Sequence, residues 1–172
     1  MNKQIFGLIV AILLVLVILI SFIFYNEWPL LTGKKIVLAT QPIDPFDLFR
    51  GQYMSINYDI SSINNVEGFD EGDSIYVLLE EDEQEIWRLK ETSKTKPDRG
   101  VFIKGEVINS YDNSVRVEYG IEQYFFERNA KIPTSNITIE ISVANSGRAK
   151  IVQLLQNSEP VKIEYEKFDI RS

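Results

Sequence analysis

The side chains that could do chemistry are concentrated between residues 41 and 58. Asp44, Asp47 and Arg50 lie within seven residues of one another, in a stretch that also contains two prolines. Two carboxylates and a guanidinium so close together could bind an anion or a metal ion. They could equally hold the loop to itself, because aspartates cap backbone N–H groups and pair with arginine. The residue types favour this second, structural interpretation.

The composition excludes several classes of catalyst. The 172 residues include neither Cys nor His, which removes thiolate nucleophiles, zinc fingers, haem and iron–sulfur ligation, and the usual general base. Ser55 and Ser74 therefore have no histidine to activate them as nucleophiles. With 18 basic and 25 acidic side chains the net charge is −7, which disfavours nucleic acid as a partner. We expect no cofactor, no metal ion and no nucleic acid.

The N-terminal segment predicts a membrane anchor. From Ile5 to Tyr25 the chain has 21 residues without a charge. As a helix they would measure about 31 Å, the thickness of the hydrocarbon core of a bilayer. Tyr25 and Trp28 close the segment as an interfacial aromatic belt would. A cleaved signal peptide is the alternative, but its apolar region is shorter and ends in a pair of small residues, which this segment lacks.

This anchor divides the chain into residues 1–30, the transmembrane segment, and residues 31–172, a single domain. The lysines on the two sides of the apolar segment, Lys3 before it and Lys34 and Lys35 after it, do not decide its orientation. A large domain translocates regardless of a modest charge bias. We expect the N-terminus inside and the C-terminal domain outside the cytoplasm.

The domain is patterned for β-structure almost throughout. In residues 137–143 apolar side chains alternate with polar ones, as on a strand with one buried face. Turn residues separate the expected strands. We therefore predict a mainly β fold, an antiparallel sandwich or open barrel preceded by one transmembrane helix. A short helix is expected only within 127–135, and the strands are expected at 36–39, 53–58, 75–79, 86–90, 101–108, 115–119, 137–143, 151–155 and 161–166.

Residues 51–58, Gly-Gln-Tyr-Met-Ser-Ile-Asn-Tyr, resemble the signature of the GDYXXLXY family of membrane-anchored bacterial proteins. The preceding stretch from Pro42 to Arg50 is similar to the Pro-x-Asp-Pro-x-Asp-Leu-x-Arg pattern of that family. A second block, 119–127, resembles its Gly-Ile-Glu-x-Tyr-Phe run. Gln52 stands where the family has Asp, which argues against a role for that carboxylate here.

The resemblance implies one N-terminal membrane helix and an extracytoplasmic domain, often encoded beside a multi-pass membrane protein. It implies no activity. We therefore expect an extracytoplasmic binding or accessory protein, held in the bilayer by Ile5 to Tyr25 and partnering an integral membrane protein. Phe46, Phe49 and Tyr53 are expected at that contact, with Arg50 as an anchor. The alternative is that the three aromatic side chains are buried in the domain's own core. The candidate binding residues are Asp44, Asp47, Arg50, Gly51, Tyr53 and Tyr58.

The alternative is an envelope hydrolase. Asp44, Asp47 and Glu122 could form a carboxylate-dependent site. A proline-rich loop that ends in glycine and runs into an apolar strand also resembles the membrane-bound signal peptidases. That loop holds no serine, and no matching lysine strand is evident, so we expect no catalytic residue.

Overall fold

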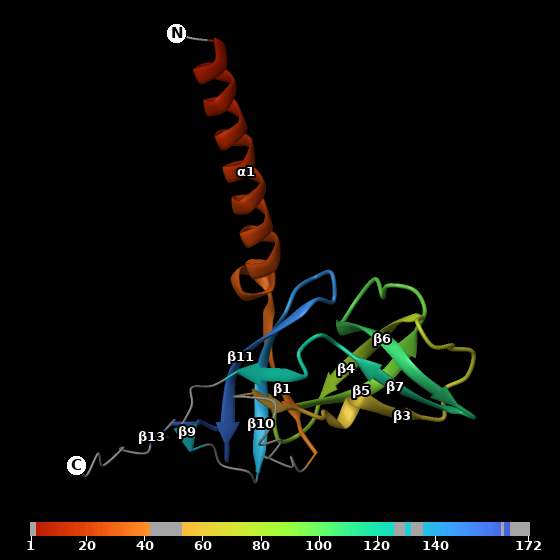
Figure 1. The fold of residues 1–172 in the computed structure, drawn as a ribbon. Coiled ribbons are helices and arrows are strands. Elements are labelled where there is room, and N and C mark those ends of the chain that lie inside the picture. Colours follow the sequence, from red (N-terminus) through yellow and green to blue (C-terminus); the bar gives the residue numbers. More distant parts are fainter. Residues whose placement is uncertain (1–2, 42–52, 126–129, 132–135, 163, 166–172) are drawn as a thin grey trace, which may run out of the picture.

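The computed structural model describes residues 3–41, 53–125, 130–131, 136–162 and 164–165. One long helix precedes a domain built of strands (Figure 1). The elements are α1 (Lys3–Thr32), β1 (Lys34–Ala39), β2 (Tyr53–Ser55), the 3-10 turn η1 (Asp59–Ser61), β3 (Ser62–Asn64), β4 (Ser74–Glu81), β5 (Ile86–Ser93), β6 (Val101–Tyr111), β7 (Ser114–Glu118), β8 (Gln123–Phe125), β9 (Ala130–Lys131), β10 (Ile137–Val143), β11 (Ala149–Gln156), β12 (Glu159–Pro160) and β13 (Glu164–Tyr165).

The helix α1 is long and apolar enough to cross a bilayer, as the sequence predicts, and no other described helix is. Its 30 residues measure about 45 Å. The apolar side chains from Ile5 to Tyr25 are exposed on every side, which suits a helix surrounded by lipid. The helix continues beyond Tyr25 for two turns, to Thr32, and these turns rest on the domain (Figure 1).

Nine strands form one strongly curled sheet that resembles half of a barrel (Figure 1). Their order is β12-β11-β10-β1-β5-β4-β6-β7-β3. The predicted mainly β fold with an open barrel is thereby confirmed. One pairing departs from the antiparallel rule: β1 runs parallel to β5, with Val37 opposite Ile86 and Leu38 opposite Trp87. Strand β1 thus joins the β10–β12 part of the sheet to the rest.

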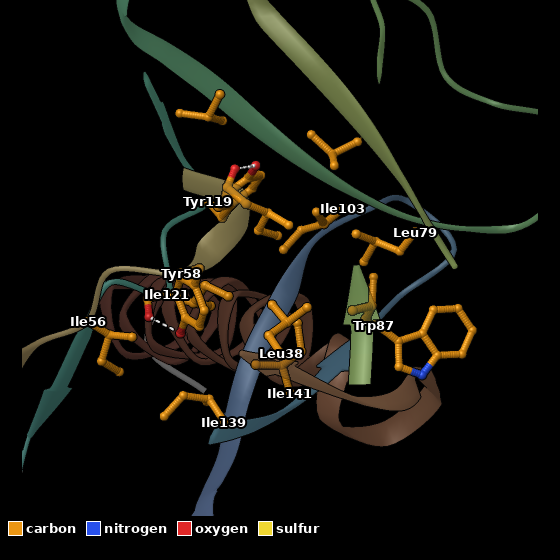
Figure 2. Packing of buried hydrophobic residues seen from close by; sticks show 14 of the residues in the cluster. Leu38, Ile56, Tyr58, Leu79, Trp87, Ile103, Tyr119, Ile121, Ile139 and Ile141 are labelled. Atoms are coloured by element: carbon orange, nitrogen blue, oxygen red, sulfur yellow. Dashed lines mark hydrogen bonds between the residues drawn. The ribbon is translucent and has the colours of Figure 1, made fainter. Parts of the chain in front are cut away.

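The hydrophobic core fills the concave face of this sheet. Apolar residues at alternating positions, including Leu38 of β1 and Ile139 and Ile141 of β10, are almost fully buried, and Tyr58 and Ile121 pack near them (Figure 2). The alternation predicted for residues 137–143 is confirmed up to Ile141. The next residue, Ser142, is polar and yet only 1% exposed.

Three predicted elements differ in the structure. The strand expected over 53–58 ends at Ser55, although Tyr58 still forms an isolated bridge with Thr40. Of the strand expected over 161–166, residues 161–162 and 164–165 are described, and 164–165 form the short β13. Before it, a turn with positive φ at 157 and 158 folds β12 back on β11. Of the short helix expected within 127–135, only 130–131 is described, and these residues form β9.

Candidate functional site

The structure describes two of the six predicted binding residues. Tyr53 begins β2, and its backbone pairs with that of Phe125 in β8. Tyr58 lies just before η1. The other four, together with Phe46 and Phe49, lie outside the described residues, so their role in binding stays a prediction; these four are Asp44, Asp47, Arg50 and Gly51.

Tyr58 is a core residue whose polar end is satisfied internally. Its side chain is fully buried, and its hydroxyl donates a hydrogen bond of 2.7 Å to the carbonyl of Ile121 (Figure 2). Burial raises the pKa of the Tyr58 phenol, and the charge of the Glu122 carboxylate raises it further. The phenol therefore stays neutral and joins the 51–58 segment to the 119–127 segment.

Tyr119 makes a second connection of the same kind. Its hydroxyl donates a 2.6 Å bond to the carbonyl of Ile60, in η1, while its backbone N–H donates to the Glu122 carboxylate. The backbone N–H of Ile56 donates to the Glu122 carbonyl at 2.7 Å. The pKa of Tyr119 is raised by burial and by Glu122, as in Tyr58. The two buried tyrosines thus connect the 51–58 segment and η1 to the 119–127 segment. The Glu122 carboxylate accepts a hydrogen bond from the backbone within the second segment.

The most strongly built polar site lies where the helix meets the domain. The carbonyl of Pro29, in the last turn of α1, accepts a 2.6 Å bond from the Ser142 hydroxyl and a 2.8 Å bond from the Gly33 N–H. This contact explains the burial of Ser142. Gly33 has no room for a side chain, because an added Cβ would lie under 3.0 Å from Pro29, Ser142 and the Val143 backbone. We call this contact, with the two described next, the junction.

Two cations of β11 and the preceding turn hold the same end of the helix. The guanidinium of Arg148 lies 4.0 Å from the centre of the Tyr25 ring and donates a 3.0 Å bond to the Tyr25 carbonyl. Lys150 pairs with Glu27 at 2.5 Å. Both cations contact α1 at the end of the apolar segment or just beyond it. β1 begins directly after Gly33, so the described chain has no flexible linker between helix and domain.

Sequence reasoning missed the junction. Arg148 and Lys150 each lie 123 residues from their partners, and neither has a local pattern that indicates them. The one local signal is Gly33, directly after the aromatic and proline residues that end the helix.

The acidic residues at 80–83 and 85 lie at the end of β4 and in the turn between β4 and β5. Asp82 accepts hydrogen bonds from the backbone N–H groups of Gln84 and Ile86 and a 2.7 Å bond from the Arg88 guanidinium. The Arg88 bond is the main reason why the pKa of Asp82 lies below its usual value, and the backbone bonds add to it. In the described parts of the chain no group of three or more acidic residues is disposed to hold a metal ion.

Comparison with family models gives one match. The model described as GDYXXLXY protein matches residues 15–154, well over half of the chain. The chain belongs to the GDYXXLXY family. The match in this GDYXXLXY protein begins inside α1 and ends in β11, so it includes the tyrosine-linked segments and all residues of the junction. No curated protein and no solved structure matches the chain.

Proposed function

We propose that this GDYXXLXY protein is a single-pass, extracytoplasmic accessory protein that presents its β domain, in a fixed orientation, to an integral membrane protein. The junction carries this proposal. A domain that only needed to stay near the membrane would be served by a flexible linker. Here Ser142, Arg148 and Lys150 hold the last two turns of α1 against the sheet.

The junction also sets the height of the domain above the bilayer. Tyr25 ends the apolar segment, and Arg148 contacts its carbonyl directly. The β10–β11 turn that carries Arg148 therefore lies at the level of the membrane interface. From there the exposed tip of this turn, Asn145 and Ser146, can reach the extramembrane loops of a neighbouring membrane protein, while the exposed face of α1 is available inside the bilayer.

Photo-cross-linking in native membranes tests the partner. A photoreactive residue is placed in the full chain at Leu13 of α1, at Ser146, or at Ser158. Ser158 is the matched control for Ser146, because both are exposed turn serines and they lie at opposite ends of β11. We expect Leu13 and Ser146 to capture the same multi-pass membrane protein, with reciprocal capture from that protein, and Ser158 not to capture it. Capture of different proteins, or capture from Ser158 alone, contradicts the proposal.

A flexible Gly-Ser linker inserted after Thr32 tests whether fixed presentation matters. The linker keeps both the anchor and the domain but separates Gly33 from Pro29. We expect the cross-link from Ser146 to be lost and that from Leu13 to be retained. An unchanged yield from Ser146 would show that the partner does not depend on the orientation of the domain.

The side of the membrane is tested with single cysteines, since the chain has none of its own. Ser158→Cys, in the exposed turn before β12, is treated with a membrane-impermeant maleimide. We expect labelling in intact cells. Labelling only after lysis would place the domain in the cytoplasm and overturn this part of the proposal.

No observation on the described residues favours the hydrolase alternative. Of its three carboxylates only Glu122 lies in the described part of the chain. That carboxylate accepts a hydrogen bond from the backbone N–H of Tyr119, three residues earlier.

A further inference from the structure

We infer that the membrane-proximal end of the domain carries a binding site for the phosphate of an anionic phospholipid headgroup. The site is a cavity of about 300 Å³ beside the junction, which we call the cationic cavity. Three segments form it: the start of β1, the connection between β5 and β6, and the β10–β11 turn. Its charged lining consists of Lys34, Lys96, Arg99 and Asp98.

The position of the cavity follows from the junction. Its wall includes Ala144 and Asn145, which belong to the same turn as Arg148. Arg148 contacts Tyr25, at the end of the apolar segment. The headgroup layer of a bilayer is about 5–8 Å thick on each side, so a turn held at Tyr25 lies within or beside it. In Figure 1 this turn and the β5–β6 connection both lie at the end of the domain from which α1 emerges.

The charge of the cavity is opposite to that of the chain. Three of its lining residues are cationic and one is acidic, whereas the whole chain carries −7. Among the described ion pairs none engages Lys34, Lys96 or Arg99, and all three side chains are exposed. The acidic residues of the β4–β5 turn lie at the other end of β5, about 26 Å away. The cationic cavity thus lies at the opposite end of β5 from this acidic turn.

The cavity is preformed. The Lys34 ammonium nitrogen lies 4.3 Å from the centre of the Trp87 ring, a cation–π contact that positions this charge. The β10–β11 turn is fastened to β6, since the Lys104 N–H donates a 2.8 Å bond to the Gly147 carbonyl. Gly147 has φ +85, and an added Cβ there would meet Phe102 and Lys104. A headgroup would therefore enter without reordering these walls.

A phosphate that carries one negative charge matches this lining. Arg99 can bind two phosphate oxygens through its planar guanidinium, and the lysines supply point charges. A zwitterionic headgroup carries an ammonium or choline group that the three cations repel. We therefore expect a preference for phosphatidylglycerol over phosphatidylcholine.

Native mass spectrometry of the full chain in detergent micelles tests the site. Each lipid is titrated into the wild type, and the bound fraction is measured. The variant Lys96→Gln/Arg99→Gln removes two cations of the cavity. The matched control, Lys90→Gln/Arg116→Gln, removes two cations outside the cavity, one on β5 and one on β7. Since each basic residue near an anionic surface contributes about 1 kcal/mol, the cavity variant is expected to bind phosphatidylglycerol about 30-fold more weakly.

The control variant is expected to bind as the wild type does, and Lys96→Arg/Arg99→Lys, which keeps both charges, is expected to retain binding. Equal weakening by the cavity and control variants would show that only net charge matters and would overturn the site. Equal affinity for phosphatidylcholine would do the same. Free glycerol phosphate binding as tightly as the lipid would overturn the membrane source of the ligand. Thermal melting of each variant, expected to match the wild type, separates these outcomes from unfolding.

Discussion

Replacing Gly33 by alanine adds one methyl group where α1 passes into β1. The new Cβ would lie under 3.0 Å from the Pro29 carbonyl oxygen, the Ser142 hydroxyl oxygen and the Val143 carbonyl carbon. Two of these three atoms belong to the backbone, so turning a flexible side chain cannot remove the overlap. The chain must shift, and the shift stretches the two hydrogen bonds that converge on the Pro29 carbonyl.

The cost can be estimated from the overlap and the bonds. Overpacking a well-filled site costs about 1–3 kcal/mol, and each of the two hydrogen bonds contributes about 0.5–1.5 kcal/mol net. These terms overlap, because moving apart relieves the strain while it weakens the bonds. We therefore expect the docked junction to lose about 1–3 kcal/mol relative to an undocked helix. Gly33 lies where α1 meets one end of the sheet, beside Val143, so we expect α1 to undock before the sheet unfolds.

Limited proteolysis of the full chain in detergent measures this equilibrium. Lys34 and Lys35 follow Gly33 directly, and Lys34 is paired with Val143 while the junction is closed. At low trypsin the cleavage rate follows the population of the open form. A loss of 1–3 kcal/mol raises that rate about 5- to 150-fold.

The matched control is Gly7→Ala, where no atom lies within 4 Å of an added Cβ, and its cleavage rate should not change. Ser142→Ala in the Gly33→Ala background removes one of the overlapping atoms. The loss in the double variant should therefore be smaller than the sum of the two single losses. Wild-type cleavage of Gly33→Ala, or strict additivity in the double variant, would refute the tight junction.

Three further predictions concern the domain and the anchor. Tyr58→Phe should lower the free energy of unfolding near neutral pH by about 1–3 kcal/mol, because the Ile121 carbonyl loses its donor. Because the pKa of Tyr58 is raised in the folded state, the folded phenol stays protonated where the unfolded one ionises, from about pH 10. Above that pH this group therefore lowers the free energy of unfolding of the wild type by about 1.4 kcal/mol per pH unit. Urea titrations should show a shallower alkaline decline in Tyr58→Phe, and equal slopes would contradict this account. For Asp82 the pKa is lowered, so its contribution is present above the usual carboxyl pKa and is lost as the pH falls through the folded value. Asp82→Asn should therefore lower the melting temperature at neutral pH but not in strong acid, whereas Glu83→Gln, exposed on the same turn, should change it in neither. Finally, the full chain should stay with membranes after an alkaline wash, with residues 5–25 present in its intact mass; a soluble product that begins near Asn26 would show cleavage instead.

The sequence by itself determined the elements of this protein. The uncharged run from Ile5 to Tyr25 admits only an apolar helix, because every turn of it presents the same kind of surface. The alternation in residues 137–143 predicts a strand with one buried face, and β10 is that strand. The mainly β fold and the family follow from such local patterns, since each is carried by neighbouring residues.

The prediction of turns and strand ends was less complete. Asn157 and Ser158 adopt positive φ in a turn that ends β11, in the gap between the strands predicted at 151–155 and 161–166. The residue types did not show that the chain pairs back on β11 directly at 159 and 160. Tyr58 was predicted as a binding residue from its place in the family signature. Its burial against Ile121 depends on β2 and β8 being paired, which brings residues 63 positions apart into contact.

Only the tertiary structure decided the junction and the cationic cavity. Ser142 occupies a polar position in the alternation of its strand and yet is buried, and this burial has a reason only once the carbonyl of Pro29, 113 residues away, lies against it. The cavity collects Lys34, Lys96 and Arg99 from two segments of a chain whose total charge is −7. Long-range contacts of this kind have no period in the sequence, because the curl and register of the sheet determine which distant residues meet.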